Sequence, residues 1–364
     1  MGRSPGDAQV SAVLSARQTE LPRSPSIWAQ AWKRLRRDRV GMASLGVVGA
    51  FMVLVLMAQM GLVASGWQRE VGTPFAPPHL VGAIADESET SVVDTPTGPN
   101  VDLSDVDPLA PWYQEWDRRA AQVKSVVTVK SRTLPLGADR MGRDVLSKAI
   151  KGAQVSILVG VFAALFATFI GTVLGALAGY FGGRVGDFLE WVYNVFTSIP
   201  YILLLFALAA VFKSGPLAKT LGQGVWTVVI ILGAVGWTGI YRLVRAEYIK
   251  HRSREYVRAA EAIGASHLSR MFGHILPNVS HVVLVQLSLL VVGFIKAEVI
   301  LSFLGLGVPI DMVSWGTMLA EAQTELVLGK WWQLATATVF MATFVTAFAL
   351  LTDALRDAMD PRLR

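Results

Sequence analysis

The residues best suited to chemistry with a partner lie between positions 255 and 277, which read EYVRAAEAIGASHLSRMFGHILP. The spacing predicts a short amphipathic helix at the start of this stretch. Its apolar face carries Tyr256, Ala259, Ala260 and Ile263. Its second face is charged and carries Glu255, Arg258 and Glu261. Such a helix could lie on the bilayer, but the alanine pair offers lipid little apolar bulk and fits a protein groove better.

The same stretch contains its own helix breakers. Gly264 predicts a C-terminal cap for the first helix. A turn at Ala265 and Ser266 is expected next, followed by a second short helix with Leu268, Met271 and Phe272. Pro277, after Leu276, is acceptable in the first turn of the helix that follows. Residues 242–277 are therefore expected to form a polar connector between two apolar runs.

Catalytic motifs are absent from the sequence. It contains no G-x-x-x-x-G-K-[ST] phosphate loop, no H-E-x-x-H pair, no G-x-S-x-G elbow and no cysteine. Cysteine ligands and nucleophiles are thereby excluded, and no metal site is expected. We therefore expect that this chain is not an enzyme, and that any ATP it depends on is bound by a partner.

Composition indicates an integral membrane protein. Of 364 residues, 53% are hydrophobic and only 16% are charged, and the mean hydropathy of +0.47 is too high for an ordinary soluble domain. Several runs without Asp, Glu, Lys or Arg are long enough to cross a hydrocarbon core of about 30 Å. They predict an all-α fold with six transmembrane helices, at about residues 40–67, 152–180, 191–212, 225–241, 278–295 and 331–351.

Basic residues set the expected orientation. Five of them lie between Lys33 and Arg39, before the first run, and seven more lie between Arg242 and Arg270. Lys and Arg gather on the cytoplasmic side of membrane proteins, so we expect both clusters and both termini in the cytoplasm. The net charge of +6 belongs to this pattern, and nucleic-acid binding is not expected.

The segments outside the spans differ in character. Residues 1–39 predict a cytoplasmic tail that ends in a basic interfacial helix, from about residue 26 onward. Residues 68–135, after the first span at 40–67, are polar, acidic and proline-bearing, and predict a long extracytoplasmic insertion whose fold the sequence does not reveal. Residues 136–364 hold the other five predicted spans and the connector.

Few residues within the predicted spans stand out. A seam for close helix packing is predicted by glycines four residues apart, at Gly171, Gly175 and Gly179. Pro200 lacks a backbone donor and should kink the third span, where a kink could serve a gate. Glu298 is a candidate gate or structural partner of Lys296, although snorkelling toward the lipid headgroups is the favoured interpretation.

Two other classes of function fit these patterns less well. An ion-gradient-driven carrier or channel usually buries a carboxylate or histidine in mid-membrane, and the six runs contain no Asp or Glu. A membrane enzyme would need a catalytic motif, and the common ones are missing.

The connector resembles the EAA loop of ABC-importer permeases, the cytoplasmic segment that docks on the ATPase subunit. The resemblance rests on the Ala259-Ala260 pair, on Gly264, and on Leu276-Pro277 thirteen residues beyond that glycine. Two positions, Arg258 and His274, depart from the general pattern and fit the dipeptide/oligopeptide/nickel branch better. Segments 134–147 (LPLGADRMGRDVLS), 301–307 (LSFLGLG) with 315–316 (WG), and 355–362 (LRDAMDPR) are also similar to that branch.

The resemblance implies the type I ABC-importer permease fold in a bacterial inner membrane. It implies a second, homologous permease subunit, one or two types of P-loop ATPase that carry ATP and Mg, and an extracytoplasmic substrate-binding protein, all assembled in membrane lipid. ATPase coupling is expected at Glu255, Tyr256, Arg258, Ala259, Ala260, Glu261, Gly264, Ala265, Ser266, Leu276 and Pro277. Substrate identity stays open among dipeptides, longer peptides, nickel complexes and sugars.

Overall fold

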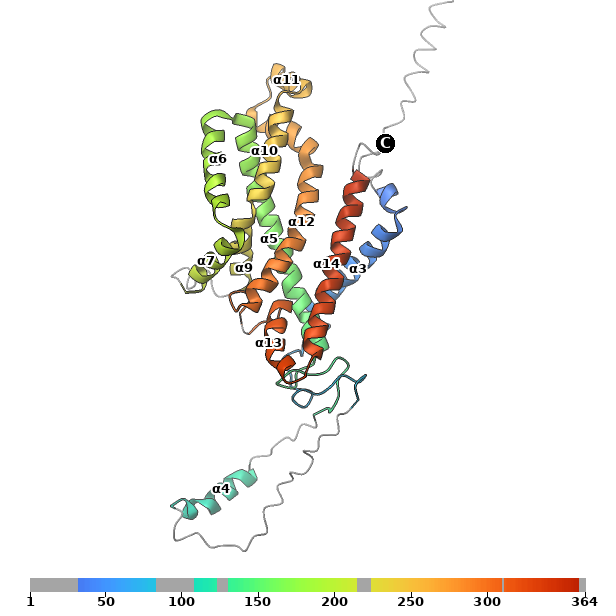
Figure 1. Ribbon diagram of the computed structural model, residues 1–364, viewed down its shortest axis with the longest axis vertical. Helices are drawn as coiled ribbons and strands as arrows, with labels where there is room; N and C mark the ends of the chain where they lie inside the picture. The colour runs from blue at the N-terminus through green and yellow to red at the C-terminus, as the bar shows by residue number, and fades with distance from the viewer. Residues whose placement is uncertain (1–31, 83–107, 123–129, 215–223, 310, 360–364) are drawn as a thin grey trace, which may run out of the picture.

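The computed structural model describes residues 32–82, 108–122, 130–214, 224–309 and 311–359 (Figure 1). Its helices are α3 (Arg39–Gln59), α4 (Ala110–Gln122), α5 (Val145–Phe181), α6 (Gly183–Ser198), α7 (Tyr201–Ser214), α9 (Val225–Gly236), α10 (Thr238–Arg252), α11 (Glu255–Ala262), the π-helix η1 (Ser269–Ile275), α12 (Leu276–Phe303), α13 (Trp315–Val327) and α14 (Trp332–Met359). Within the described residues the only β pairing consists of isolated bridges. The predicted all-α fold is confirmed.

Four of these segments are long and apolar enough to cross a membrane, namely α3, α5, α14 and the continuous stretch Ser269–Phe303. Two further spans arise if each bent helix pair counts as one. The pair α6 and α7 bends by 88°, and the pair α9 and α10 bends by 44°. Up to six spans therefore fit the described residues, as predicted.

Several predicted span boundaries differ from the ends of the helices, and two of the differences have a local cause. The first helix ends at Gln59 rather than near residue 67, because Gly61 adopts φ +73° and the Leu62 N–H donates to the Met57 carbonyl at 2.9 Å, which closes the helix. The second begins at Val145 rather than at 152, because the Asp144 carboxylate caps it by accepting from the Ser147 N–H at 3.0 Å.

The third and fourth spans are not the continuous helices that were predicted. Pro200 lies between α6 and α7, and Ile199 before it is extended, as the residue before a proline prefers. The predicted kink is therefore a complete break. The fourth span is interrupted at Trp237, and its second part, α10, continues to Arg252, well beyond the predicted end at 241.

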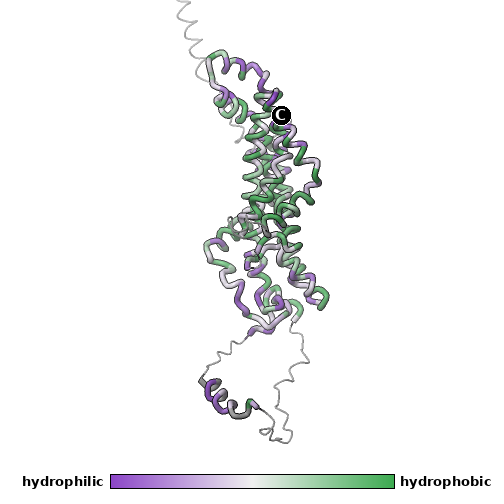
Figure 2. Tube along the Cα trace, turned by 90° about the vertical axis from the view of Figure 1, so that its left-hand side faces the viewer, coloured by the Kyte–Doolittle hydropathy of each residue, from purple (hydrophilic) through white to green (hydrophobic). Residues whose placement is uncertain are grey.

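The helices run between two polar ends. Figure 1 shows α11, the start of α3 and the end of α14 toward one end of the molecule, and α13 with the segments 60–82 and 130–144 toward the other. Hydrophobic residues fill the length between these ends, and hydrophilic residues gather near them (Figure 2). This arrangement is typical of a bundle that spans a bilayer.

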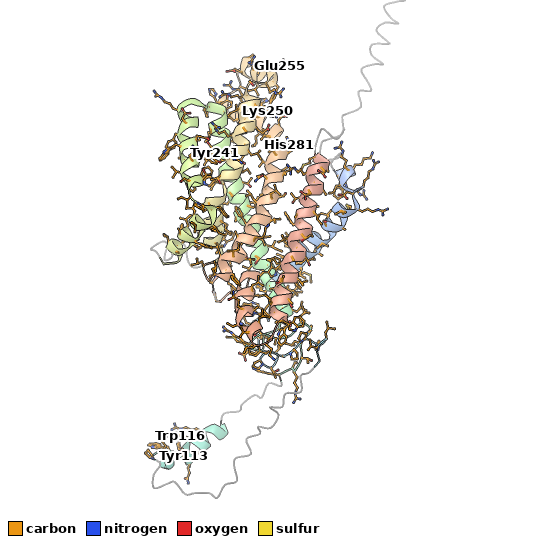
Figure 3. All side chains as sticks on the ribbon, viewed as in Figure 1. Tyr113, Trp116, Tyr241, Lys250, Glu255 and His281 are labelled. Atoms are coloured by element: carbon orange, nitrogen blue, oxygen red, sulfur yellow. The ribbon has the colours of Figure 1, made fainter. Side chains whose placement is uncertain are left out.

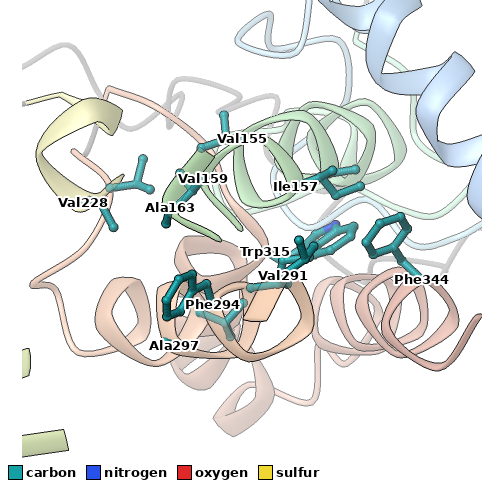
Figure 4. Close-up of a cluster of buried hydrophobic side chains, with 14 of the residues drawn as sticks. Val155, Ile157, Val159, Ala163, Val228, Val291, Phe294, Ala297, Trp315 and Phe344 are labelled. Carbon is teal, nitrogen blue, oxygen red and sulfur yellow. The ribbon is translucent and has the colours of Figure 1, made fainter. Parts of the chain in front are cut away.

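Helix α5 is the centre of the bundle, and half of its most apolar window is buried. Its inner residues pack with α9, α12 and α14 in one cluster that includes Ile157, Phe294, Trp315 and Phe344 (Figure 4). The Trp315 indole N–H donates to the Ala149 carbonyl at 3.2 Å. The indole N–H of Trp315 is therefore buried together with a hydrogen-bond acceptor.

The two ends of the insertion pair with each other and with the segment that precedes α5. Isolated bridges join Glu70 to Arg143 and Pro78 to Leu134. The Arg143 guanidinium lies 5.8 Å from the centroid of the Trp67 ring. The described part of the insertion contains one helix, α4. The first part of the predicted interfacial helix, residues 26–31, lies outside the described residues, which begin with a helical turn at 32–35.

Candidate functional site

The connector between α10 and α12 forms a compact helical hairpin. Helix α11 ends at Ala262, and Gly264 follows with φ +82°, a conformation that glycine adopts without strain. The Ala265 N–H donates to the Ala260 carbonyl at 3.0 Å and reverses the chain. Figure 3 shows Glu255, at the start of α11, at the far end of the bundle beyond Lys250.

The inner face of the connector packs on the bundle. Val257 is buried, as are Met271 and Ile275 of η1, against Ile240 and Val244 of α10. The Tyr248 hydroxyl donates to the Met271 carbonyl at 3.0 Å. The connector is therefore fixed to the membrane helices, so a displacement of one carries the other with it.

The outer face of the connector is apolar and exposed. Ile263 is 84% exposed, Leu268 65% and Phe272 38%, and Ala259 is also exposed. We call these four residues the docking face. Apolar side chains at the tip of a hairpin gain about 1.5–3 kcal/mol each when a partner covers them.

Ala260 does not face outward, although both alanines of the pair were expected to lie on the face that contacts a partner. Only Ala259 of the pair faces outward, because Ala260 is 4% exposed within the chain itself. The reason is that the buried stripe of α11 runs through Val257 and Ala260, three residues apart, rather than through Tyr256 and Ile263. Ala260 lets α11 approach its own bundle, and Ile263 supplies the exposed apolar bulk.

Polar contacts tie the hairpin to the end of α5. Arg270 is nearly buried and pairs with Glu261 at 2.7 Å, which joins η1 to α11. Its guanidinium lies 5.9 Å from the centroid of the Tyr180 ring. The Tyr180 hydroxyl and the His267 Nδ1 are 3.0 Å apart. These contacts give the connector a second route to the bundle, through α5.

The second short helix that was predicted after the turn is present, and its residues Ser269–Ile275 form a π-helix. It runs directly into α12, and the Leu276 N–H donates to the Met271 carbonyl, five residues back. Pro277 has no N–H for the carbonyl four residues before it, and its ring would crowd that carbonyl. A wider turn before a proline relieves this conflict, and such turns are frequent at functional sites.

The three seam glycines lie where α5 meets α10. A Cβ atom on Gly175 would lie 2.7 Å from the Tyr241 carbonyl oxygen, and one on Gly179 would lie 2.6 Å from that of Arg245. A Cβ on Gly171 would overlap Ile240. Their neighbours are largely backbone, so the two helices cannot make room for a side chain.

Gly175→Ala is expected to destabilise the protein by about 1–3 kcal/mol, because the added methyl group would overpack a backbone contact. Gly293→Ala in α12 is the matched control, since a Cβ there meets nothing within 4 Å. Thermal unfolding in detergent measures both. An unchanged midpoint for Gly175→Ala would contradict the close contact of α5 and α10.

A buried ion network lies at the opposite end, and the sequence reasoning missed it. The Lys148 ammonium is 1% exposed and lies 2.8 Å from Asp139 and 2.5 Å from Glu321. The Arg143 guanidinium Nε donates to Asp139 at 2.7 Å. Burial raises the pKa of the Asp139 carboxyl, but Lys148 and Arg143 outweigh burial and hold that pKa below its usual range. The network joins the segment 130–144 to α5 and α13.

Glu325 of α13 is buried beside this network and only partly satisfied. One carboxylate oxygen accepts from the Arg140 N–H at 3.2 Å, and the other has no partner among the described residues. Burial raises the pKa of Glu325 from 4.5 to about 7, although Arg140 and Lys148 act in the opposite direction. The folded state therefore holds a proton that the unfolded chain releases.

The raised pKa of Glu325 predicts that the stability of the folded protein depends on pH. The stabilisation is fully present below pH 4.5 and is lost as the pH rises through about 7, so wild type is expected to unfold more readily at pH 8 than at pH 5. A shift from 4.5 to about 7 corresponds to a difference on the order of 3 kcal/mol. Glu325→Gln should remove most of this dependence. Parallel pH profiles for both proteins would contradict it.

Glu298 does not snorkel and does not pair with Lys296. Its side chain is fully buried and accepts hydrogen bonds from Ser156 at 2.7 Å and from Ser302 at 2.6 Å. Lys296 is exposed, because it lies two residues away on a different face of α12. The Ser302 hydroxyl also accepts from the Val308 N–H at 3.0 Å, so Glu298 holds the loop after α12 in place.

Comparison with known proteins identifies the family of this chain. Residues 171–364, more than half of the chain, match the family of binding-protein-dependent transport system inner membrane components. Residues 26–69 match the N-terminal TM domain of oligopeptide transport permease C. The chain belongs to this permease family. The resemblance seen in the sequence is thereby confirmed, and the protein is a multi-pass membrane permease subunit of the ABC-importer type.

Relatives of this permease extend over nearly the whole chain. The dipeptide transport system permease protein DppC of Bacillus subtilis (strain 168) is 30% identical over 350 residues, which cover 96% of this chain and 90% of the relative. The oligopeptide transport system permease protein OppC of Escherichia coli (strain K12) is 37% identical over 228 residues, which cover 63% and 72%. The crystal structure of an amino acid ABC transporter with histidines covers 58% of this chain and 94% of its own, with 13% identity and a TM-score of 0.41.

Among the described residues of this permease, no group of three or more His, Asp or Glu side chains is placed to hold a metal ion. The titratable side chains that are buried there serve ion pairs and loop contacts.

Proposed function

We propose that this permease forms half of the translocation path of an ATP-driven importer for peptides, and that the connector 255–277 couples it to separate ATPase subunits. The observation that carries the proposal is the docking face. Three large apolar side chains are exposed at the tip of a hairpin whose inner face is locked to α5, α10 and α12. Nothing within the described chain covers them.

Charge supports a cytoplasmic position for this hairpin. The end that carries α11 also carries Arg242 through Arg270, seven basic residues, and the cluster before α3 lies toward the same end (Figure 1). Because basic residues remain in the cytoplasm, we assign this end and both termini to the cytoplasmic side. The insertion and α13 then lie outside, where a substrate-binding protein could reach them.

The assembly we infer has four kinds of component. They are this chain, a second homologous permease, one or two types of P-loop ATPase that carry ATP and Mg, and an extracytoplasmic binding protein. ATP hydrolysis on the partners shifts an alternating-access equilibrium through the hairpin, while this chain carries out no catalysis. The assignment to peptides rests on the relatives, whose names are those of dipeptide and oligopeptide permeases.

Reconstitution tests the proposal. The chain is co-expressed with the companion permease, ATPases and binding protein encoded beside it, and the purified complex is placed in proteoliposomes. We expect uptake of a labelled di- or oligopeptide that requires ATP on the hairpin side and the binding protein on the other. Uptake driven by an ion gradient without ATP would overturn the proposal. Ligand that co-purifies with the binding protein would identify the substrate.

A further inference from the structure

A groove of about 630 Å³ runs along the outside of the bundle between α3 and α14. On α3 it is lined by Val40, Ala43 and Val47, which share one helix face. On α14 its lining extends from Ala342 to Leu350, about 12 Å along the helix axis. Apart from Ser44, Thr343 and Thr346, the walls are hydrocarbon, and a single charged side chain, Arg39, lines one end.

The groove lies on the part of the bundle that the chain itself covers least. Only 22% of the most apolar window of α3 is buried, against 50% for α5. Farther along, the two helices close on each other, where the rings of Phe51 and Phe344 have centroids 5.3 Å apart. The groove therefore has an apolar floor, is closed at its far end, and opens to the outside of the bundle.

The open end of the groove is positively charged. Residues 32–39 and 353–359 together carry six basic side chains, five of them between Lys33 and Arg39, against three acidic ones at Asp38, Asp353 and Asp357. Within the described residues, Arg36, Arg37 and Arg39 are exposed and form no ion pair with a carboxylate. Of these three, Arg39 lines the groove, so a negative group at this end would meet a free guanidinium donor.

We propose that this groove binds an anionic phospholipid, with the phosphate against Arg39 and one acyl chain along Ala43, Val47 and Thr343. The two parts of the site match the two parts of that molecule. An apolar slot of about 12 Å accepts hydrocarbon, and basic clusters beside membrane helices attract anionic headgroups by about 1 kcal/mol per residue. A helix of another subunit would also fill the slot, but an apolar helix would give the unpaired Arg39 guanidinium no negative partner.

The test uses the absence of cysteine from the chain. Thr343→Cys places one thiol in the groove, where it is labelled with a fluorophore, and the purified transporter is inserted into phosphatidylcholine nanodiscs. These contain a few mole per cent of nitroxide-tailed lipid with either a phosphatidylglycerol or a phosphatidylcholine headgroup. We expect at least twofold stronger quenching by the anionic lipid, and a preference that weakens as salt is raised.

Two variants make the result specific. Arg39→Gln in the Thr343→Cys background should remove the headgroup preference while the label stays accessible to both lipids. Val53→Cys, a 57% exposed position on α3 outside the groove, should show equal quenching by both lipids in the wild-type background. Equal quenching at Thr343→Cys would overturn the proposal. So would a label that neither lipid reaches, because a protein helix would then occupy the groove.

Discussion

The double variant Ile263→Asp/Leu268→Asp is expected to reduce ATP-driven uptake at least 100-fold while leaving the protein inserted in the membrane. Both side chains are mostly exposed, so the folded chain loses little when they become polar. Docking loses two apolar contacts of about 1.5–3 kcal/mol each and must also desolvate two carboxylates. Since each 1.4 kcal/mol is tenfold in affinity, two such losses alone weaken binding by roughly two orders of magnitude.

Val185→Asp is the matched control for this variant. Val185 is 46% exposed in the first turn of α6, between Arg184 and Asp187, and lies outside the connector. The same substitution at this position should leave uptake within about twofold of wild type, because a change at an exposed site outside the core and outside the docking face has a small effect. Uptake, ATPase activity stimulated by substrate, and co-isolation of the ATPase are measured together. Normal co-isolation with the double variant would contradict the docking face.

Asp139→Ala is expected to destabilise the protein by about 4 kcal/mol. The carboxylate is fully buried and accepts from the N–H groups of Met141 and Arg143, each at 2.9 Å, and from the side chains of Arg143 and Lys148. Its removal leaves the buried Lys148 ammonium with one counter-charge, Glu321, in place of two, and breaking a buried ion pair typically costs about 3–5 kcal/mol. The midpoint of unfolding in detergent should fall by many degrees, and the segment 130–144 should become sensitive to protease.

Glu70→Ala provides the comparison. Glu70 pairs with Lys130 at 2.8 Å, but both side chains are at least one-third exposed, and such surface pairs are worth at most about 1 kcal/mol. A larger loss of unfolding free energy for Asp139→Ala than for Glu70→Ala would show that an ion pair contributes more when it is buried. Equal losses for the two variants would show that the Lys148 network is no more important than a surface ion pair.

The apolar runs were sufficient to predict the membrane-spanning segments, because a segment in lipid has to satisfy its own backbone hydrogen bonds. Pro200 and Gly264 also fixed local geometry, since each residue acts through its own backbone. The prediction was poorer at span ends. There Gly61 and Asp144, which lie inside or beside the apolar runs, decided where α3 stops and α5 starts.

The features that the sequence did not reveal depend on distant partners. Lys148 meets Asp139 nearby, but also Glu321 and Gln333, more than 170 residues away, and nothing local indicates that its ammonium is buried. Ala260 faces inward because η1 and α10 pack against the stripe it shares with Val257. Glu298 is buried because Ser156 of α5 reaches it. Each contact is set by tertiary packing that helical periodicity cannot show.

Site-specific cross-linking tests the central claim most directly. The chain has no cysteine, so Ile263→Cys introduces one thiol into the docking face, and Val185→Cys introduces one outside it. A short heterobifunctional reagent, with a maleimide for the introduced thiol and a photoreactive group for any side chain nearby, is applied to the complete transporter in membranes. We predict a cross-linked product of Ile263→Cys with the ATPase subunit, and none for Val185→Cys. A product with the extracytoplasmic binding protein, or none with the ATPase, would contradict the assignment of this hairpin as the coupling element.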